Sequence, residues 1–245
     1  MTYRIEFTGF CIKGPQRNNN EDNLLCAGVC LPAVHEDLNL AVDEIPAGND
    51  CWLAVFDGMG GEAKGECASF LSAEAMAKAS EETSDPERIA NSMNRAVCDF
   101  AQSQQTPAMG STVAAVCFGR TQIIGFNVGD SRCYRMRDGC LDRLSEDHAR
   151  VVPAGEQKLL TQHIGINESD FAIEPHIFES EYRDGDQYLL CTDGVTDQIM
   201  DRKIREILVG PASLEEKRDC LRSRLESKDV PDNSTAILVR VLEGD

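Results

Sequence analysis

The chain has 245 residues, of which 42% are apolar, and this is enough to bury a substantial core in one large domain or two small ones. Its 42 acidic and 24 basic residues give a net charge of −18, which repels nucleic acid, anionic membranes and phosphate-bearing ligands. It holds no apolar run of the roughly 18 residues that a membrane helix needs, and no apolar signal-peptide core near its start. We therefore expect a cytoplasmic protein whose partners include neither nucleic acid nor membrane.

The first half of the chain predicts strands followed by two helices. Apolar and alternating runs predict three strands here, at 3–12, 22–30 and 51–56. The polar stretch at 31–50 is long for a strand connection and predicts an extra hairpin or a surface loop. Residues 63–80 are rich in Ala, Glu, Lys and Met and predict a helix. A second helix is expected to begin at Asp85-Pro86, with Asp as cap and Pro in the first turn, and to run to about residue 105.

The second half predicts successive antiparallel strands and then helices. Period-two patterns predict six strands, at 111–118, 121–128, 132–137, 172–180, 186–192 and 235–242. Helical patterns occupy 194–208 and 213–227. Because strands occur at both ends and in the middle, with helix pairs between them, we predict antiparallel sheets covered by helices. The chain 1–245 is expected to form a single α+β domain.

The eleven cysteines resemble a disulfide framework only in their number. That number is odd, no CxxC pair occurs, and most of the cysteines lie inside apolar patterns, as Cys117 and Cys191 do. We predict free, reduced, packed thiols rather than zinc ligands or disulfides.

Three acidic residues stand beside apolar strand-like runs. The run 51–56 ends in Asp57-Gly58, and the run 188–192 ends in Asp193-Gly194. Asp232 comes shortly before a third apolar run, 236–239. Strands that deliver carboxylates to one end of a sheet would form an acidic cluster, and such a cluster is costly without cations. The pattern predicts a divalent-metal enzyme.

Two further loops carry charged side chains that suit phosphate and metal ions. The loop around Arg17 holds a guanidinium, which suits bidentate recognition of a phosphoryl group, and the adjacent acids Glu21 and Asp22, which offer hard oxygen ligands. A Gly-Asp-Ser turn between two predicted strands holds Asp130. Taken alone, each loop is better explained as an ordinary turn: a polar surface turn around Arg17 and a hairpin turn at Asp130.

Taken together, the motifs resemble the metal-dependent serine/threonine protein phosphatases, the type 2C or PPM family, and particularly its compact bacterial members. Six motifs occur in the family's order and spacing, and they cover about residues 5 to 241. They are Arg17-x-x-Asn20-Glu21-Asp22, Val55-Phe56-Asp57-Gly58-Met59-Gly60-Gly61, Gly110-Ser111-Thr112, Val128-Gly129-Asp130-Ser131-Arg132, Leu190-Cys191-Thr192-Asp193-Gly194 and Asp232-Asn233-Ser234-Thr235.

The resemblance implies a fold and a binuclear metal centre. The fold is a four-layer α-β-β-α sandwich, with two central antiparallel sheets flanked by helix pairs. Asp57 would bridge two divalent cations, manganese or magnesium. Asp193 and Asp232 would hold one of them, and Glu21 with the carbonyl of Gly58 would hold the other.

The resemblance also implies three further roles. Arg17 would bind the substrate phosphate and take part in catalysis together with Asp57. Asp22 would be a close or second-shell acid, and Asp130 with Asp193 would form the site of a third, weaker metal ion. The implied reaction is hydrolysis of phosphoserine and phosphothreonine in proteins by a metal-activated water, with substrates drawn from those of a cognate serine/threonine kinase.

The chain departs from the family in two places. Met59 stands where animal members have a histidine that can protonate the leaving alcohol, so a metal-bound water is the expected acid. Only about a dozen residues separate His148 from Leu160, where bacterial relatives carry a longer flap. The short flap leaves the site more open and the choice of substrate undecided.

Two other functions stay open at this point. One is a catalytically silent scaffold that binds phosphoproteins, although the expected metal acids are all present. The other is a phosphatase of small phosphometabolites, which an open site would admit. Nothing in the sequence calls for an oligomer, and we expect a monomer.

Overall fold

The computed structural model describes residues 2–48, 51–60, 64–106, 109–151, 158–167, 171–227 and 232–244. Gly61, the expected start of the first helix at 63, and most of the shortened stretch between His148 and Leu160 lie outside the described residues. In the described part of the chain, no helix is long and apolar enough to span a membrane.

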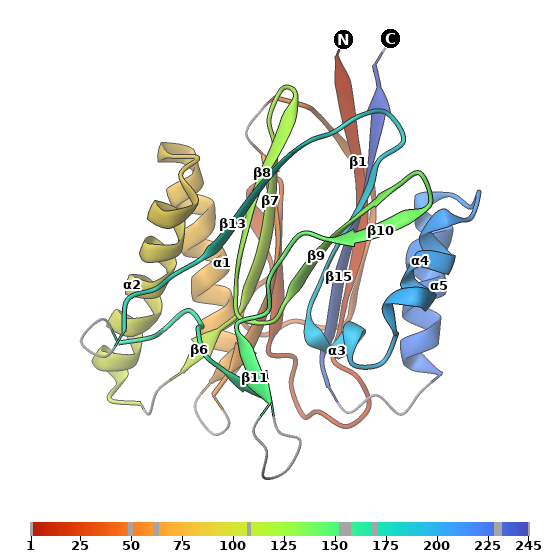
Figure 1. The fold of residues 1–245 in the computed structure, drawn as a ribbon. Helices are drawn as coiled ribbons and strands as arrows, with labels where there is room; N and C mark the ends of the chain where they lie inside the picture. Colours follow the sequence, from red (N-terminus) through yellow and green to blue (C-terminus); the bar gives the residue numbers. More distant parts are fainter. Residues whose placement is uncertain are drawn as a thin grey trace.

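Two antiparallel sheets form the centre of the molecule (Figure 1). The first sheet has the order β10 (Cys140–Arg143), β9 (Arg132–Arg137), β14 (Gln187–Cys191), β15 (Ser234–Glu243), β1 (Tyr3–Ile12) and β4 (Leu38–Pro46). The second has the order β13 (His176–Glu181), β8 (Gln122–Val128), β7 (Val113–Phe118), β5 (Trp52–Met59), β2 (Asp22–Cys26) and β3 (Val29–Cys30), with β6 (Gly110–Ser111) beside β5. A separate small hairpin joins β11 (Ala149–Val151) to β12 (Lys158–Leu160).

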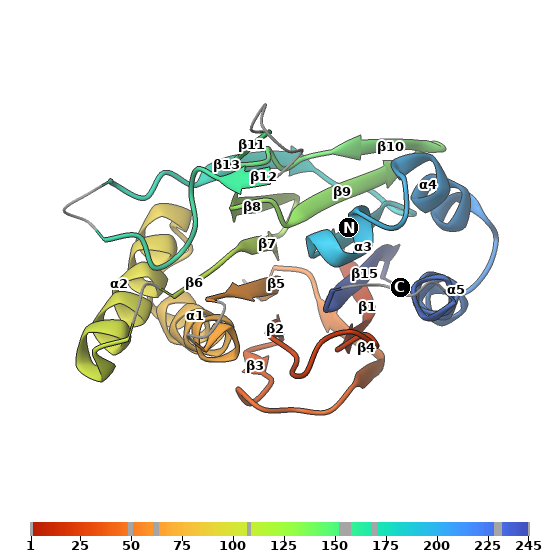
Figure 2. The same ribbon diagram turned by 90° about the horizontal axis from the view of Figure 1, so that it is seen from below.

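Helix pairs cover the outer faces of the two sheets (Figure 2). α1 (Gly65–Glu82) and α2 (Pro86–Gln104) pack on the second sheet, and α4 (Asp201–Val209) and α5 (Leu214–Glu226) pack on the first. A one-turn helix, α3 (Asp193–Thr196), follows β14 directly. This arrangement confirms the predicted four-layer α-β-β-α sandwich.

The layering explains why the central strands are apolar at consecutive positions. Leu190 of β14 packs between the two sheets, whereas its neighbour Leu189 packs beneath α4 and α5. Both faces of the strand are therefore covered, and apolar side chains are favoured on both. β7 is buried at every residue for the same reason. None of the eleven cysteines forms a disulfide; five of them are buried, and Cys140 is exposed rather than packed as predicted.

Local signals fix the helix starts that the sequence predicted. The side chain of Asp85 accepts a hydrogen bond from the N–H of Glu87, with Pro86 in the first turn of α2. Ser213 and Glu216 form a reciprocal capping box at the start of α5.

Two predicted elements are divided in the structure. The strand expected at 22–30 turns at Ala27 and Gly28, where both residues have positive φ, and becomes the hairpin of β2 and β3. The helix expected at 194–208 is interrupted by Met200, which is extended with ψ 148°. Because buried apolar residues continue at helical spacing through this break, the sequence pattern did not reveal it.

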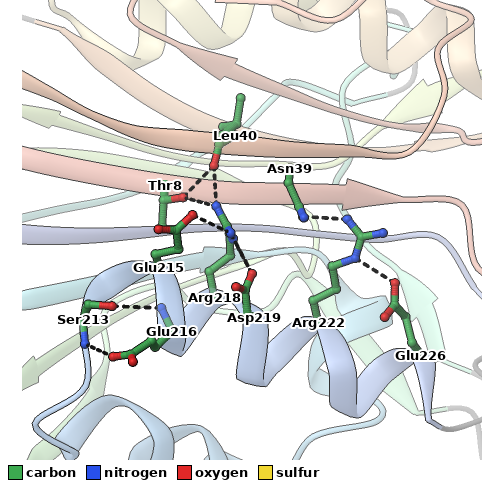
Figure 3. Close-up of polar contacts among 10 residues, drawn as sticks. All are labelled: Thr8, Asn39, Leu40, Ser213, Glu215, Glu216, Arg218, Asp219, Arg222 and Glu226. Carbon is green, nitrogen blue, oxygen red and sulfur yellow. Dashed lines mark hydrogen bonds and ion pairs between the residues drawn. The ribbon is translucent and has the colours of Figure 1, made fainter.

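The stretch at 31–50 contributes an edge strand, β4, that α5 holds in place (Figure 3). The pairing of β1 with β4 shifts between Phe7 and Gly9, and Leu40 is the residue that pairs with Gly9 directly after this shift. Arg218 of α5 donates to that carbonyl at 2.6 Å and to Thr8 Oγ1 at 3.0 Å. The expectation of a hairpin or surface loop is thus replaced by a strand of the first sheet.

Candidate metal centre

A cleft of about 650 Å³ is lined by residues at, or next to, strand ends of both sheets. These strand ends lie at the end of the molecule away from the chain termini (Figure 1). Apart from Leu159 and Leu160 of β12, the described residues that line the cleft come from the strand ends and loops that carry the sequence motifs. The full set is Gln16, Arg17, Asn18, Asn19, Glu21, Asp57, Gly58, Met59, Gly60, Thr112, Asp130, Leu159, Leu160, Asp193 and Asp232. The structure therefore brings together every predicted site residue except Asp22, which lies buried beside the cleft.

Asp57 is positioned by hydrogen bonds to the strands beside β5. Its backbone N–H donates to Thr112 Oγ1 at 3.2 Å, and its carbonyl accepts from the N–H of Thr112 at 2.8 Å. Thr112 Oγ1 is in turn 2.6 Å from Ser131 Oγ. The two sequence motifs Gly-Ser-Thr and Gly-Asp-Ser thus meet beneath Asp57.

Gly58 permits the close approach of three chain segments. Its N–H donates to the carbonyl of Glu21 at 3.0 Å, and a Cβ built on it would collide with the carbonyls of Gly65 and Glu21. No side chain larger than hydrogen fits here without moving backbone. The glycine is therefore required by packing as well as by any role of its carbonyl.

Two oxygen ligands converge on one point at the start of α1. A Cβ built on Gly65 would lie 2.9 Å from Glu21 Oε1 and 2.9 Å from the Gly58 carbonyl oxygen. Both oxygens therefore face the same small space, and both are hard donors of the kind that magnesium and manganese prefer. This geometry fits the pairing of Glu21 with the Gly58 carbonyl that the sequence predicted.

Asp193 and Asp232 approach the cleft from the other sheet. Asp193 is the first residue of α3, directly after β14, and Asp232 precedes β15. Gly194 lies against the backbone carbonyl of Asn233, so closely that a Cβ would collide with it. This contact holds the two strand ends together and places their carboxylates on the same side of the cleft.

The carboxylates repel one another in the absence of cations. Burial raises the pKa of Asp57 well above its ordinary value, and the charges of Asp22, Asp193 and Asp232 raise it further. Burial also raises the pKa of Glu21, an effect that nearby Arg17 opposes. Divalent cations are the ordinary means of stabilising such a cluster in its ionised form.

Asp22 pairs with Asp57 across the β2–β5 ladder and is 2% exposed. Its Oδ2 accepts hydrogen bonds from Thr192 Oγ1 at 3.0 Å and Thr235 Oγ1 at 2.7 Å. Its Oδ1 is buried and has no hydrogen-bond partner among the described residues. Burial, together with the charges of Asp193 and Asp232, raises the pKa of Asp22 to about 8.

Arg17 stands over the cleft, with 44% of its side chain exposed. One of its Nη atoms lies 2.7 Å from Asp232 Oδ1. Burial lowers the pKa of Arg17, but this hydrogen bond and the charge of Asp232, together with the charges of Glu21 and Asp57, raise it above its ordinary value. It is the only guanidinium among the described residues that line the cleft. It is thus placed to contact an anion bound there.

Asp130 lies at the rim of the cleft and is 6% exposed. The preceding Gly129 has a φ of +96°, and its N–H donates to His148 Nδ1 at 3.2 Å. His148 therefore supports the Asp130 turn and does not line the cleft.

The donor set fits two divalent cations. Within the described residues, no three His, Cys, Asp or Glu side chains already stand as close as in a preformed metal cage. The fit depends instead on the converging Glu21 and Gly58 oxygens, the orphaned carboxylate oxygen of Asp22, and the carboxylates of Asp57, Asp193 and Asp232 around one cleft. An all-oxygen set of this kind suits manganese or magnesium.

Sequence reasoning assigned no role to several residues that build the site. Thr112 orients the backbone of Asp57, Thr192 and Thr235 bind Asp22, and Asn233 binds the backbone of Glu21. Each lies inside a quoted motif, so the motif was the available signal. The hydrogen bond of Thr235 to Asp22 joins residues 213 positions apart along the chain, and no sequence pattern reports such contacts.

Comparison with known proteins supports the same class. The family model described as "Protein phosphatase 2C" matches residues 41–228. The "Serine/threonine phosphatase stp" of Listeria welshimeri is 29% identical over 210 residues, which cover 76% of this chain and 82% of that protein. The "Serine/threonine protein phosphatase PstP" of Mycobacterium tuberculosis is 30% identical over 79% of this chain and 41% of its own length.

A solved structure shares the fold over nearly the whole chain. The catalytic domain of PstP, crystallised in complex with two manganese ions, superposes with a TM-score of 0.77 and 26% sequence identity. The superposition covers 98% of this chain and 100% of that domain.

The chain belongs to the protein phosphatase 2C family. It is therefore a metal-dependent serine/threonine protein phosphatase, as the sequence motifs indicated.

Proposed function

We propose that the cleft hydrolyses phosphoserine and phosphothreonine side chains of protein substrates, with the residue roles that the motifs predicted. The observation that carries this proposal is the convergence of the Glu21 and Gly58 oxygens with the carboxylates of Asp57, Asp193 and Asp232 on one cleft, beside the exposed guanidinium of Arg17. Glu21 and the Gly58 carbonyl would hold one cation, Asp193 and Asp232 would hold the other, and Asp57 would contribute to both.

The cations, when bound, supply a water of lowered pKa and positive charge opposite the phosphoryl oxygens. With the cations bound, the carboxylates would stay ionised at positions that the two sheets fix, so that little reorganisation is needed during the reaction. No side chain has to form a covalent bond to phosphorus. Asp130 is assigned to a third, weaker cation together with Asp193, and Asp22 to support of the centre from behind Asp57.

Arg17 binds the substrate phosphate. Its guanidinium is exposed in the cleft and can form two parallel hydrogen bonds to phosphoryl oxygens. This cation also makes a site on a chain of net charge −18 attractive to a dianionic group.

The leaving alcohol receives its proton from a water molecule in the cleft, not from a side chain. None of the four histidines is among the described residues that line the cleft. His148 Nδ1 accepts the N–H of Gly129, and His163 Nδ1 lies 2.9 Å from the Ile164 carbonyl. Met59, which lines the cleft, has no proton to donate.

We assign the enzyme to the cytoplasm as a monomer, acting on proteins phosphorylated by a cognate serine/threonine kinase. The relatives named above as serine/threonine phosphatases support phosphoprotein substrates. The manganese bound to PstP supports manganese as one of the usable metals, alongside magnesium.

Phosphate release from a phosphothreonine peptide, with manganese, with magnesium and with chelator, tests the proposal. We expect metal-dependent turnover that chelator abolishes. A sugar phosphate measured in parallel should show a much lower kcat/KM, and a higher value would assign the enzyme to small phosphometabolites instead. Absence of turnover with either metal, in protein that is folded and binds metal, would contradict the proposal.

A further inference from the structure

Asn233 connects the phosphate-binding loop to the metal ligands. It is 3% exposed, and its side-chain amide contacts only backbone groups among the hydrogen bonds of the described residues. The Nδ2 group donates to the carbonyl of Lys13 at 2.7 Å and to the carbonyl of Asn19 at 3.0 Å. The Oδ1 atom accepts from the N–H of Glu21 at 2.8 Å.

These three bonds close the loop that carries Arg17. Lys13 and Asn19 lie on either side of Arg17 in the sequence, and one amide group draws their carbonyls together. The same amide fixes the backbone of Glu21, whose side chain faces the Gly58 carbonyl. A single buried side chain thus helps to fix the positions of both the loop of Arg17, the proposed phosphate-binding residue, and Glu21, a proposed metal ligand.

The backbone of Asn233 links this loop to the other side of the centre. Its N–H donates to Asp232 Oδ1 at 2.8 Å, the same atom that Arg17 approaches at 2.7 Å. Its carbonyl lies against Gly194, next to Asp193. Asn233 thus connects the Arg17 loop to the backbone beside both Asp193 and Asp232, in addition to the direct contact between Arg17 and Asp232.

We propose that Asn233 is a positioning residue that holds the Arg17 loop at a fixed place over the metal ligands, and this inference depends on the proposed role of Arg17. Only an amide supplies two donors and one acceptor in this volume. Aspartate keeps the acceptor but loses both donors, and alanine loses all three bonds. Asn233 touches neither the cleft nor a reacting atom, so it acts through Arg17 and Glu21.

Amide hydrogen exchange of the chelator-treated protein tests the geometry without turnover. In Asn233→Ala, the N–H of Glu21 loses its acceptor and should exchange about tenfold faster than in the wild type, in line with the loss of one hydrogen bond. In Asn233→Asp that acceptor remains, so Glu21 should stay protected. Unchanged exchange in Asn233→Ala would overturn the proposal.

A double-mutant cycle tests the link to Arg17. Asn233→Ala should raise KM for a phosphothreonine peptide about tenfold, with a smaller change in kcat, because a mobile guanidinium binds phosphate less well. In the Arg17→Ala background the same substitution should change KM less than about twofold. Equal effects in both backgrounds would show that Asn233 acts independently of Arg17 and would overturn the proposal.

Two further variants serve as a fallback and as a control. Asn233→Asp retains volume and one bond, so it continues the test if Asn233→Ala does not fold, and it should also raise KM. Asn94 is a matched control, since it is 1% exposed and its amide binds the backbone of Gly165 and Ile166, outside the cleft lining. Asn94→Ala should lower the melting temperature and leave KM unchanged. If the wild type shows no metal-dependent turnover, the proposed function fails, while the exchange measurement still decides the role of Asn233.

Discussion

Two polar clusters in this molecule are each built around a buried charged side chain, and they differ in how that charge is balanced. On α5, the Arg218 side chain is 5% exposed, and all three of its guanidinium nitrogens have partners (Figure 3). Carboxylates of Glu215 and Asp219 lie at 3.1 and 2.7 Å from it and balance its charge. At the cleft, Asp22 and Asp57 are surrounded by further carboxylates, and an oxygen of Asp22 has no partner in the described structure.

The difference shows which cluster has its charges balanced by groups of the chain itself and which needs an added cation. A buried charge that is paired and hydrogen-bonded on every side stabilises a fold only if it stays paired, and removal of one partner is costly. A cluster of like charges with raised pKa values is destabilising until an external cation binds. We therefore expect substitutions in the first cluster to affect stability, and substitutions in the second to affect metal binding and turnover.

The largest effect is expected for Asp193→Asn. The substitution removes one negative metal ligand, so turnover of a phosphothreonine peptide should fall by about a hundredfold or more. The fold should persist, because the change relieves repulsion with Asp57. Steady-state kinetics and thermal unfolding measure the two expectations, and near-normal turnover would contradict the assignment of Asp193.

Arg218→Ala should have the converse effect. It leaves the Leu40 carbonyl and two carboxylates without their cation, and we expect a loss of about 3 kcal/mol in the free energy of unfolding. The kcat and KM of the folded fraction should stay within about twofold of the wild type, because α5 contributes nothing to the described cleft lining.

Arg222, one turn along the same helix, is the matched control for Arg218. It is 20% exposed and binds Asn39 Oδ1 and Glu226. Arg222→Ala should cost less than about 1 kcal/mol, because these contacts are closer to solvent. Equal losses for the two arginines in chemical denaturation would contradict the view that the bulge in β4 depends on Arg218.

Arg17→Ala should raise KM for the phosphopeptide by about tenfold, with a smaller fall in kcat. The substitution removes a phosphate contact and leaves the metal ligands in place. Calorimetric titration with manganese provides the control, since metal affinity should change little. A variant that no longer binds metal would show that Arg17 belongs to the metal centre rather than to the substrate site.

The sequence predicted most of the fold because the two sheets impose strong patterns. Strands such as β7 and β14 are apolar on both faces, and the Asp85 and Ser213 caps mark helix starts. The break at Met200 and the strand β4 were missed because the first interrupts no apolar spacing and the second is largely exposed. β4 also contacts Arg218 of α5, and this contact joins residues 178 positions apart, which no sequence pattern reports.

The sequence predicted only those site residues whose own chemistry suits binding a metal ion or a phosphate. Carboxylates, a guanidinium and glycines can be recognised as candidate site residues in the sequence by their charge or their conformational freedom. Asn233 and Thr192 do not, since their value lies in which backbone or carboxylate atoms the fold brings to them. Such supporting residues become visible only in three dimensions.

The smallest expected effect is the change of the melting temperature of the metal-free protein with pH. The raised pKa of Asp22, to about 8, and that of Asp57 mean that the folded state holds these protons more tightly than the unfolded chain does. That stabilisation is fully present below the ordinary carboxylate range and is lost as the pH rises through about 8. In chelator, the melting temperature should therefore be higher at low pH than at high pH, by about 3 °C between pH 6 and pH 8.5.

Manganese and Asp22→Asn separate the origin of this pH dependence. Manganese binds the ionised carboxylates, so it should raise the melting temperature most at the higher pH and cancel or reverse the trend. Asp22→Asn keeps an oxygen for Thr192 and Thr235 but removes the charge, and it should flatten the dependence in chelator. A chelator-treated wild type that is more stable at pH 8.5 than at pH 6 would mean that the carboxylates are already balanced by the protein. The contrast with the Arg218 cluster would then not hold.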